Sequence, residues 1–365
     1  MNVVPKSYRF ADVLSIINGR NQKKVEAADG QYPIYGSGGI MGWANDYICP
    51  ENTVVIGRKG SINNPIYVDR KFWNVDTAFG LVSNRNLLLP RYLFYFCVCF
   101  DFEKLNTTVT IPSLTKTNLL QIKISLPPLE EQEKLIHRLD KLCHLIELKK
   151  EQLKRLDILA KSRFIEMFCD SKAKFQKLGD VCGVGSSKRV FVEELQTKGI
   201  PFFRGTEVGR LAEDKDIEPT LFITEEHYIA LCKHTGKPKI GDLLLPSICP
   251  DGRVWCVNSE RPFYFKDGRV LWVKVPDAIN GCYLRFALSQ SIIENYSTLA
   301  SGITFAELKI VTLKEAPIPL PPLALQNEFA SFIEQLDKSK FSISRQQKMI
   351  DSCQRGIILH LTGRL

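Results

Sequence analysis

The stretch SLPPLEEQEKLIHRLDKLCHLIELKKEQLKRLDILAKSRFIEMF, residues 125–168, decides how this chain is organised. Its double proline, Pro127 and Pro128, ends the preceding segment, because proline fixes φ and cannot continue a strand. Three glutamates follow, at the point where a helix dipole favours negative charge. No Gly or Pro interrupts residues 129–168. An uninterrupted helix of roughly 40 residues would be about 60 Å long.

A seven-residue apolar rhythm runs through this predicted helix. It comprises Leu139, Ile146, Leu153, Ala160 and Met167, with Leu135, Leu142 and Leu156 at companion positions. Such a narrow apolar seam suits one partner helix, as in a coiled coil. A long core helix of a single domain is the alternative interpretation.

The predicted partner is at the other end of the chain, in PIPLPPLALQNEFASFIEQLDKSKFSISRQQKMIDSCQRGIILHL, residues 317–361. Its seam is Phe329, Leu336, Ile343, Ile350 and Ile357. The double prolines and the following glutamines, Gln132 and Gln326, match at an offset of 194 residues, and the two Leu-Asp-Lys triplets at 197. A slip of three residues is close to one helical turn and keeps the same face. The chain is therefore an internal duplication.

Composition sets the class of protein. The chain has 365 residues, enough for two or three domains, and 44% hydrophobic and 24% charged residues, as in ordinary soluble proteins. The net charge of +9 points to a polyanionic partner. The 11 cysteines form no CxxC pair and the five histidines are scattered, which argues against a zinc site. There is no signal peptide and no apolar run long enough to span a bilayer, so we expect a cytoplasmic protein.

The flanking regions predict two similar globular domains. In residues 1–125, short β-branched and aromatic runs alternate with Gly, Asn and Pro turns, which indicates strands. The segment 87–104 is apolar nearly all round, which indicates a buried helix. Residues 171–318 repeat this plan with different turn residues. We therefore predict an α+β fold with two pseudo-symmetric domains, 1–125 and 171–318, each followed by a spacer helix, 126–170 and 319–365. Divergent loops on a shared scaffold suit two different specificities.

Catalytic and cofactor motifs are weak or absent. Asn64-Pro65-Ile66-Tyr67 departs from the Asn-Pro-Pro-Tyr loop of amino-methyltransferases at its third position, and no S-adenosylmethionine motif accompanies it. Glu307-Leu308-Lys309 matches a nuclease fragment, but an intervening helix separates it from the nearest Pro-Asp. No P-loop and no Ser/His/Asp constellation can be identified. We predict a non-enzymatic protein without cofactor or metal.

Basic loops flanked by glycine are better candidates for function. Glycine lets the backbone approach a phosphate closely, and arginine can also read guanine in the major groove. Each loop could equally be an ordinary solvated turn, but such loops occur in both repeats. The predicted DNA-binding residues are Ser37, Arg58, Lys59, Ser61, Asn63, Lys188, Arg189, Arg204, Thr206 and Arg253. The predicted helix-pair or partner interface is Leu139, Leu142, Ile146, Leu153, Leu156, Leu336, Ile343, Ile350 and Ile357.

These features together resemble the DNA-specificity subunit of a Type I restriction–modification system. The resemblance rests on the LPPL segments followed by Gln (126–132 and 320–326), the paired helices with Leu-Asp-Lys, and the domain openings FADVLSII and LGDVCGVG. It implies two target-recognition domains that read a bipartite double-stranded DNA sequence, with the helices setting the gap. It also implies two modification (methyltransferase) subunits and restriction subunits as partners, and no catalytic residues in this chain.

Two other classes of function stay open at this point. A pseudo-two-fold interaction scaffold would use the helices to bind partners and would show little salt-dependent, sequence-selective DNA binding. An active methyltransferase would have to bind its cofactor without help from another chain.

Overall fold

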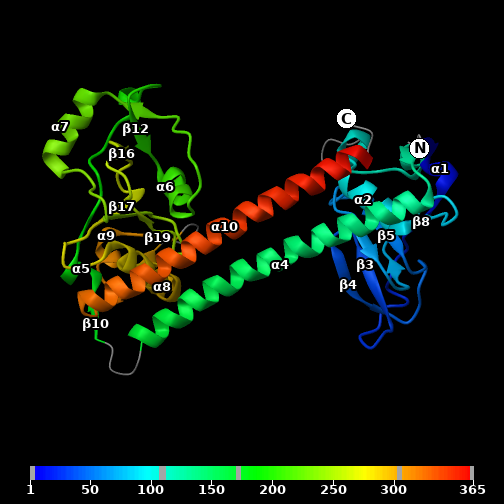
Figure 1. Ribbon diagram of the computed structural model, residues 1–365, viewed down its shortest axis with the longest axis horizontal. Helices are drawn as coiled ribbons and strands as arrows, with labels where there is room; N and C mark the ends of the chain where they lie inside the picture. The colour runs from blue at the N-terminus through cyan, green and yellow to red at the C-terminus, as the bar shows by residue number, and fades with distance from the viewer. Residues whose placement is uncertain (1–4, 107–111, 170–173, 302–305, 362–365) are drawn as a thin grey trace. The chain divides into compact units, whose positions relative to one another are not determined.

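The computed structural model describes residues 5–106, 112–169, 174–301 and 306–361 (Figure 1). It divides into two compact units, one made of residues 1–153 and 342–365 and the other of residues 154–341. Each unit therefore combines one globular domain with one stretch of each long helix. Among the described residues, no helix is both long and apolar enough to cross a membrane.

The first unit holds two small sheets and a strand pair. Its elements in chain order are β1 (Lys6–Arg9), α1 (Phe10–Val13), β2 (Leu14–Asn18), β3 (Tyr32–Gly36), β4 (Gly39–Ala44), β5 (Thr53–Gly57), β6 (Ile66–Val68), β7 (Trp73–Asn74), β8 (Ala78–Ser83), α2 (Pro90–Cys99), η1 (Phe102–Leu105), α3 (Lys116–Leu120) and β9 (Lys123–Leu126). The strand orders are β2-β8-β5-β6, β4-β3-β7 and β1-β9. The pairs are antiparallel except β3 with β7, which run parallel.

The second unit repeats this topology. Its elements are β10 (Phe175–Lys177), α5 (Leu178–Val181), β11 (Gly183–Gly185), η2 (Val192–Glu194), β12 (Ile200–Phe203), α6 (Gly205–Ala212), β13 (Phe222–Ile223), α7 (Glu225–Thr235), β14 (Leu243–Pro246), β15 (Trp255–Cys256), β16 (Tyr264–Phe265), β17 (Val270–Lys274), α8 (Gly281–Leu299), β18 (Ala300–Ser301), β19 (Glu307–Leu308), α9 (Ile310–Leu313) and β20 (Pro317–Pro319). The orders β11-β17-β14-β15 and β13-β12-β16 match those of the first unit, including a parallel pair, β12 with β16. Among the described residues of the first unit, no helices correspond to α6 and α7.

The two long helices are α4 (Leu129–Phe168) and α10 (Leu323–Leu361). Each starts directly after its double proline. All nine residues of the predicted interface are buried or half-buried, whereas Ile158 and Phe341 on the same helices are 56% and 72% exposed. In the second unit, Lys340 pairs with Asp157 at 2.6 Å and Arg163 with Glu328 at 3.3 Å. The helices are therefore antiparallel, and the two-domain fold with a paired-helix spacer is confirmed.

The strands that precede the double prolines, β9 and β20, are hydrogen-bonded to the buried helices of the two domains. Tyr92 of α2 donates to the carbonyl of Ser125, and Tyr283 of α8 donates to that of Pro319 at 2.6 Å. Each carbonyl lies in the strand that leads into a long helix. The buried helix of each domain is therefore hydrogen-bonded to the strand that precedes its spacer helix. The buried helix predicted within residues 87–104 is α2, whose Tyr92, Leu93 and Phe96 belong to the core of the first unit.

Candidate nucleic-acid interface

Equivalent loops in the two units have the same backbone frame. Arg58 follows β5; its amide donates to the carbonyl of Thr77 at 2.8 Å, and its carbonyl accepts from Leu114 at 2.9 Å. Ser247 follows β14, the equivalent strand; its amide donates to the carbonyl of Arg269 at 2.9 Å, and its carbonyl accepts from Leu308 at 2.7 Å. The loops that end these two central strands therefore occupy corresponding places in the duplicated fold.

In the first unit, this loop touches the turn between β3 and β4. A Cβ built on Gly57 would lie 2.4 Å from the carbonyl oxygen of Ser61 and 3.0 Å from Cβ of Ser37, so a side chain at Gly57 would clash. Gly60 has φ +79°, a conformation that other residues adopt with strain. The loop conformation thus depends on both glycines, and it places Ser37 beside the 57–61 segment.

The two cations of this loop are available to solvent. Arg58 and Lys59 are exposed, and neither forms an ion pair with any residue that the structure describes. The Nη1 atom of Arg58 lies 3.5 Å from the carbonyl of Asp76, and the guanidinium lies 5.9 Å from the ring centroid of Phe79. Unpaired cations on a fixed backbone can bind phosphate through their full charge.

Of the other predicted residues in this loop, Ser61 is exposed and Asn63 is engaged within the domain. The Asn63 side-chain oxygen accepts from the amide of Phe102 at 2.7 Å, and its nitrogen lies 3.4 Å from Oδ1 of Asp101. Asn63 therefore ties the loop to η1. Its part in any DNA contact would be to hold the loop in place.

In the second unit, three predicted residues meet in one pocket of about 350 Å³. Its lining is Arg204, Gly205, Thr206, Pro246, Ser247, Ile248, Arg253, Lys266 and Arg269. The pocket lies at the end of β14, the place that corresponds to the Arg58 loop. Sequence reasoning had missed Lys266 and Arg269, although they flank Gly268 (φ +65°) in a Gly-bearing basic turn like the ones it selected.

The arginines of this pocket are paired with carboxylates. Arg253 lies 2.8 Å from Asp251 and 3.7 Å from Glu213, and Arg269 pairs with Glu307. The Arg204 Nε and Nη2 atoms donate to the two carboxylate oxygens of Glu207 at 3.1 and 2.6 Å. The pocket is therefore rich in oriented donors, while much of its positive charge is balanced locally.

Glu207 is the most strongly held of these acids. Its side chain is 14% exposed, and Oε2 also accepts from the amide of Arg204 and the hydroxyl of Thr206, both at 2.9 Å. Burial raises the pKa of Glu207, but the hydrogen bonds from Arg204 and Thr206 outweigh it and lower the pKa to about 2. Glu207 is thus ionised at neutral pH, and it fixes Arg204 at the start of α6.

Lys188 and Arg189 lie on a neighbouring loop and do not line this pocket. The amide of Lys188 donates to the Tyr264 hydroxyl at 2.9 Å, and Arg189 pairs with Asp267 at 3.1 Å. Ser186 connects the two regions, since its hydroxyl accepts from the amide of Gly268 at 3.0 Å. The second unit therefore carries basic residues on both sides of the β16–β17 turn.

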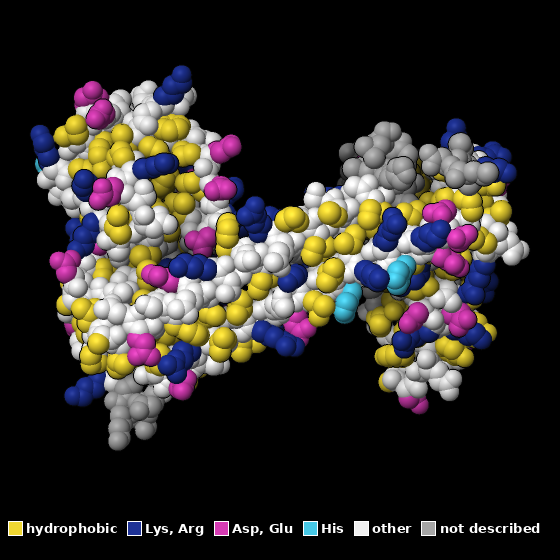
Figure 2. Space-filling model, viewed as in Figure 1, with side chains coloured by type: hydrophobic (Ala, Val, Ile, Leu, Met, Phe, Trp, Pro, Cys, Tyr) yellow, Lys and Arg dark blue, Asp and Glu magenta, His cyan; other side chains and the backbone are white. Residues whose placement is uncertain are grey.

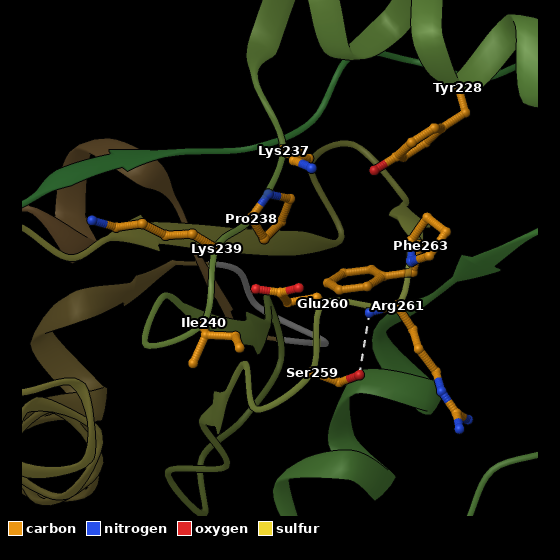
Figure 3. Close-up of a pocket in the computed structure, with 10 residues that line it drawn as sticks. Tyr228, Lys237, Pro238, Lys239, Ile240, Ser259, Glu260, Arg261 and Phe263 are labelled. Carbon is orange, nitrogen blue, oxygen red and sulfur yellow. Dashed lines mark hydrogen bonds between the residues drawn. The ribbon is translucent and has the colours of Figure 1, made fainter.

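A second pocket, of about 430 Å³, lies beside α7 (Figure 3). Its basic side chains do not converge: Figure 3 shows Arg261 and Lys239 pointing away from its centre. Lys239 pairs with Asp277 at 2.7 Å, and Ile240 is 55% exposed. This arrangement offers no cluster of donors comparable to that at the end of β14.

The two sequence fragments that weakly match catalytic motifs, 64–67 and 307–309, contain residues that make contacts within the fold. Ile66 and Tyr67 lie in β6, where the Tyr67 hydroxyl donates to the side chain of Asn52 at 2.6 Å. Glu307 is occupied by its ion pair with Arg269. Across the described ranges, no three His, Cys, Asp or Glu side chains are grouped so as to hold a metal ion.

Comparison with known proteins identifies the family. The model of the Type I restriction modification DNA specificity domain matches residues 5–157 and 170–350. The chain belongs to this family. A putative type I restriction enzyme specificity subunit of Haemophilus influenzae is 25% identical over 91% of this chain and 88% of that protein. A specificity subunit of Methanocaldococcus jannaschii is 24% identical over 98% of this chain and 92% of its own length.

Solved structures support the fold. The crystal structure of a Type I restriction–modification S subunit from M. genitalium aligns with TM-score 0.58 and 16% identity, over 99% of this chain and 97% of that one. A structure from work on assembly and conformational transition of the type I system aligns with TM-score 0.60 and 17% identity, over 99% of both chains. As a specificity-family protein, this chain has a target-recognition role in a restriction–modification complex and is not itself an enzyme.

Proposed function

We propose that each globular domain reads one half of a bipartite DNA sequence, and that α4 and α10 set the gap between the halves. The observation that carries this proposal is the pair of equivalent loops after β5 and β14. The loop after β5 carries Arg58 and Lys59, and the loop after β14 carries Arg253 and borders the pocket that Arg204 also lines. Both loops are held by the same backbone hydrogen bonds, and they differ in almost every side chain. A duplicated frame with divergent donors suits two half-sites of different sequence.

We further propose that the long helices recruit two modification subunits and, for cleavage, restriction subunits. The seam residues hold α4 and α10 together, so a partner would contact other side chains. Exposed hydrophobic residues on these helices are available for contact with a partner, and Figure 2 shows hydrophobic side chains at the surface along both long helices. They are Leu145, Leu148, Ile158, Leu159, Ile165, Phe341 and Met349. Such exposed apolar residues are typical of protein-binding surfaces. This function requires access to chromosomal DNA and hence a cytoplasmic location.

The decisive experiment is a DNA selection. The purified chain, combined with its modification subunit, is mixed with a library of random duplexes, and the retained fragments are sequenced. A motif with two halves separated by a fixed gap is the expected result. Retention without a motif, or no retention, would contradict the proposal and favour an interaction scaffold.

A further inference from the structure

We infer that Arg204, held by Glu207, selects a guanine in the half-site read by the second domain. This inference rests on the proposed function and adds a residue and a base to it. It comes from the contrast between two kinds of arginine. Arg58 forms no ion pair with any described residue, whereas Arg204 is fixed by two hydrogen bonds from its guanidinium to one carboxylate.

The pairing leaves the recognition edge of Arg204 available. A guanidinium carries its donors in a rigid planar fork. Glu207 receives one hydrogen from Nε and one from Nη2. Both hydrogens of Nη1 and the second of Nη2 have no acceptor among the described residues. One hydrogen of Nη1 and the second hydrogen of Nη2 lie side by side on the edge of the guanidinium that does not face Glu207. This pair of donors matches N7 and O6 of guanine, which are both acceptors. The side chain is 44% exposed and lines the pocket at the end of β14.

The contact with Glu207 also reduces the conformational entropy that Arg204 would lose on binding DNA. A free arginine loses rotamer entropy when it docks, about 0.5–1.5 kcal/mol for a side chain of this kind. Glu207 has already restricted Arg204, and it is itself restrained by Thr206 and by the start of α6. Arg204 therefore meets DNA with its donors already oriented, and Glu207 acts as a positioning residue.

The surroundings favour a base over a phosphate. The ionised Glu207 balances the charge of Arg204, so this pair gains little from the field of a polyanion but keeps its directional donors. Pro246 and Ile248 add apolar surface to the same pocket, and apolar side chains contact bases in the major groove. The unpaired Arg58 and Lys59 in the first domain suit phosphate instead, because release of counterions depends on net cation charge.

The test is the DNA selection repeated with variants of the full chain together with the modification subunit. Arg204→Ala removes the donors, and Arg204→Lys keeps the charge but loses the fork. Glu207→Gln removes the balancing charge and weakens the positioning contact. Arg210→Ala is the matched control, because Arg210 is exposed, lies on the same helix and does not line the pocket.

The expected result is a change at one G·C position of one half-site. Preference for that pair should fall roughly 5- to 150-fold in both Arg204 variants, the range for one bidentate contact. The other half-site and the gap should not change. Arg204→Lys should keep the salt dependence of the wild type. Glu207→Gln should reduce the preference and steepen the slope of log affinity against log salt by up to about one, because it frees a cation.

Other results separate the two proposals. If the wild type selects a bipartite motif and Arg204→Lys leaves every position unchanged, the assignment of Arg204 is wrong and the proposed function stands. A uniform loss of affinity at all sequences would make Arg204 a phosphate contact and also overturn the assignment. If the wild type selects no motif, both proposals fail. Retention of the first half-site by each variant reports that the chain is folded.

Discussion

Gln132 and Gln326 make the same contacts at the starts of the two long helices. The side-chain oxygen of Gln132 accepts from the amide of Leu89 at the start of α2, and that of Gln326 accepts from the amide of Asn280 at the start of α8, both at 2.9 Å. Each side-chain nitrogen donates to the carbonyl of the first proline of its pair, at 3.0 and 2.8 Å. One glutamine in each repeat thus joins a domain helix to its spacer helix.

Removing this contact should destabilise the first unit. Gln132 is fully buried, and Gln132→Leu would leave the amide of Leu89 and the carbonyls of Leu87 and Pro127 without their partner. A buried group that loses its hydrogen bond costs about 1–3 kcal/mol. We expect a clear fall in the free energy of unfolding, measured with urea. Gln152→Leu, at an exposed site on the same helix, is the control. Equal losses in the two variants would rule out this role.

The repeated glutamine also explains what sequence could predict. The double prolines, the heptad seam and Gln132 with Gln326 recur at fixed spacing, so the duplication, the helix pair and the two-domain plan could all be read from one chain. The repeated Asp of the Leu-Asp-Lys triplets has a structural counterpart as well. Asp140 pairs with Arg91 and Asp337 with Arg285, each linking a spacer helix to the buried helix of its domain.

The loop after β5 should supply charge for DNA binding. Arg58→Ala/Lys59→Ala should weaken binding to all sequences and reduce the slope of log affinity against log salt by up to about two, since each phosphate contact contributes about 0.9. The measurement is the dissociation constant at several salt concentrations.

A second Arg-Lys dipeptide, at the other end of β5, provides the control for this double variant. Arg70 and Lys71 are exposed and follow β6. Because β6 is antiparallel to β5 and Val68 pairs with Thr53, they lie at the opposite end of β5. Arg70→Ala/Lys71→Ala should leave the slope unchanged. If both double variants behave alike, the 57–61 segment is an ordinary turn.

The contact between Glu207 and Arg204 should make the free energy of unfolding depend on pH in the acidic range. The folded pKa of about 2 lies below the ordinary value of 4.5. The contribution of the ionised Glu207 to the free energy of unfolding is therefore complete above pH 4.5 and is lost as the pH falls toward 2. Because Arg204 is nearly half exposed, the contribution is about 1–2 kcal/mol.

Urea unfolding of the wild type and Glu207→Gln at pH 6, 4 and 2.5 measures this difference. The wild type should be more stable at pH 6, and the gap between the two curves should close on acidification. Curves that remain parallel would show that Glu207 is not held as the geometry indicates.

Sequence could not assemble the pocket at the end of β14. Arg204, Arg253 and Arg269 come from three separate loops, and their proximity depends on tertiary packing. The sequence predicts a loop at Arg204, whereas the structure has a short helix, α6, that begins at Gly205 and has Glu207 as its third residue. In the first domain, the sequence does not show that the Asn63 side chain is bonded to the amide of Phe102 and lies beside Asp101, because these partners are brought to Asn63 only by the fold.

The exposed apolar residues of α4 should matter for assembly and not for folding. Ile158 and Leu159 are 56% and 47% exposed, so Ile158→Gln/Leu159→Gln should leave the melting temperature nearly unchanged. If a partner buries them, each loses up to about 1–2 kcal/mol of contact energy. Co-purification and calorimetry with the modification subunit should therefore show at least tenfold weaker association. Ile229→Gln on α7, also exposed, is the control. Unchanged association would exclude this surface.

The length of the helix pair should set the gap between half-sites. Repeating residues 147–153 after Leu153 and residues 335–341 after Phe341 adds one heptad to each helix. Seven residues fall only about 20° short of two turns, so the seam is kept. Each helix grows by about 10 Å, close to three base pairs at 3.4 Å each.

DNA selection with this variant should recover both half-sites with a gap longer by about three base pairs, if the helices follow the duplex axis. A heptad added to α4 alone would shift its seam against that of α10, and binding should be lost. The original gap, recovered with both half-sites intact from the double insertion, would show that something other than helix length fixes the spacing.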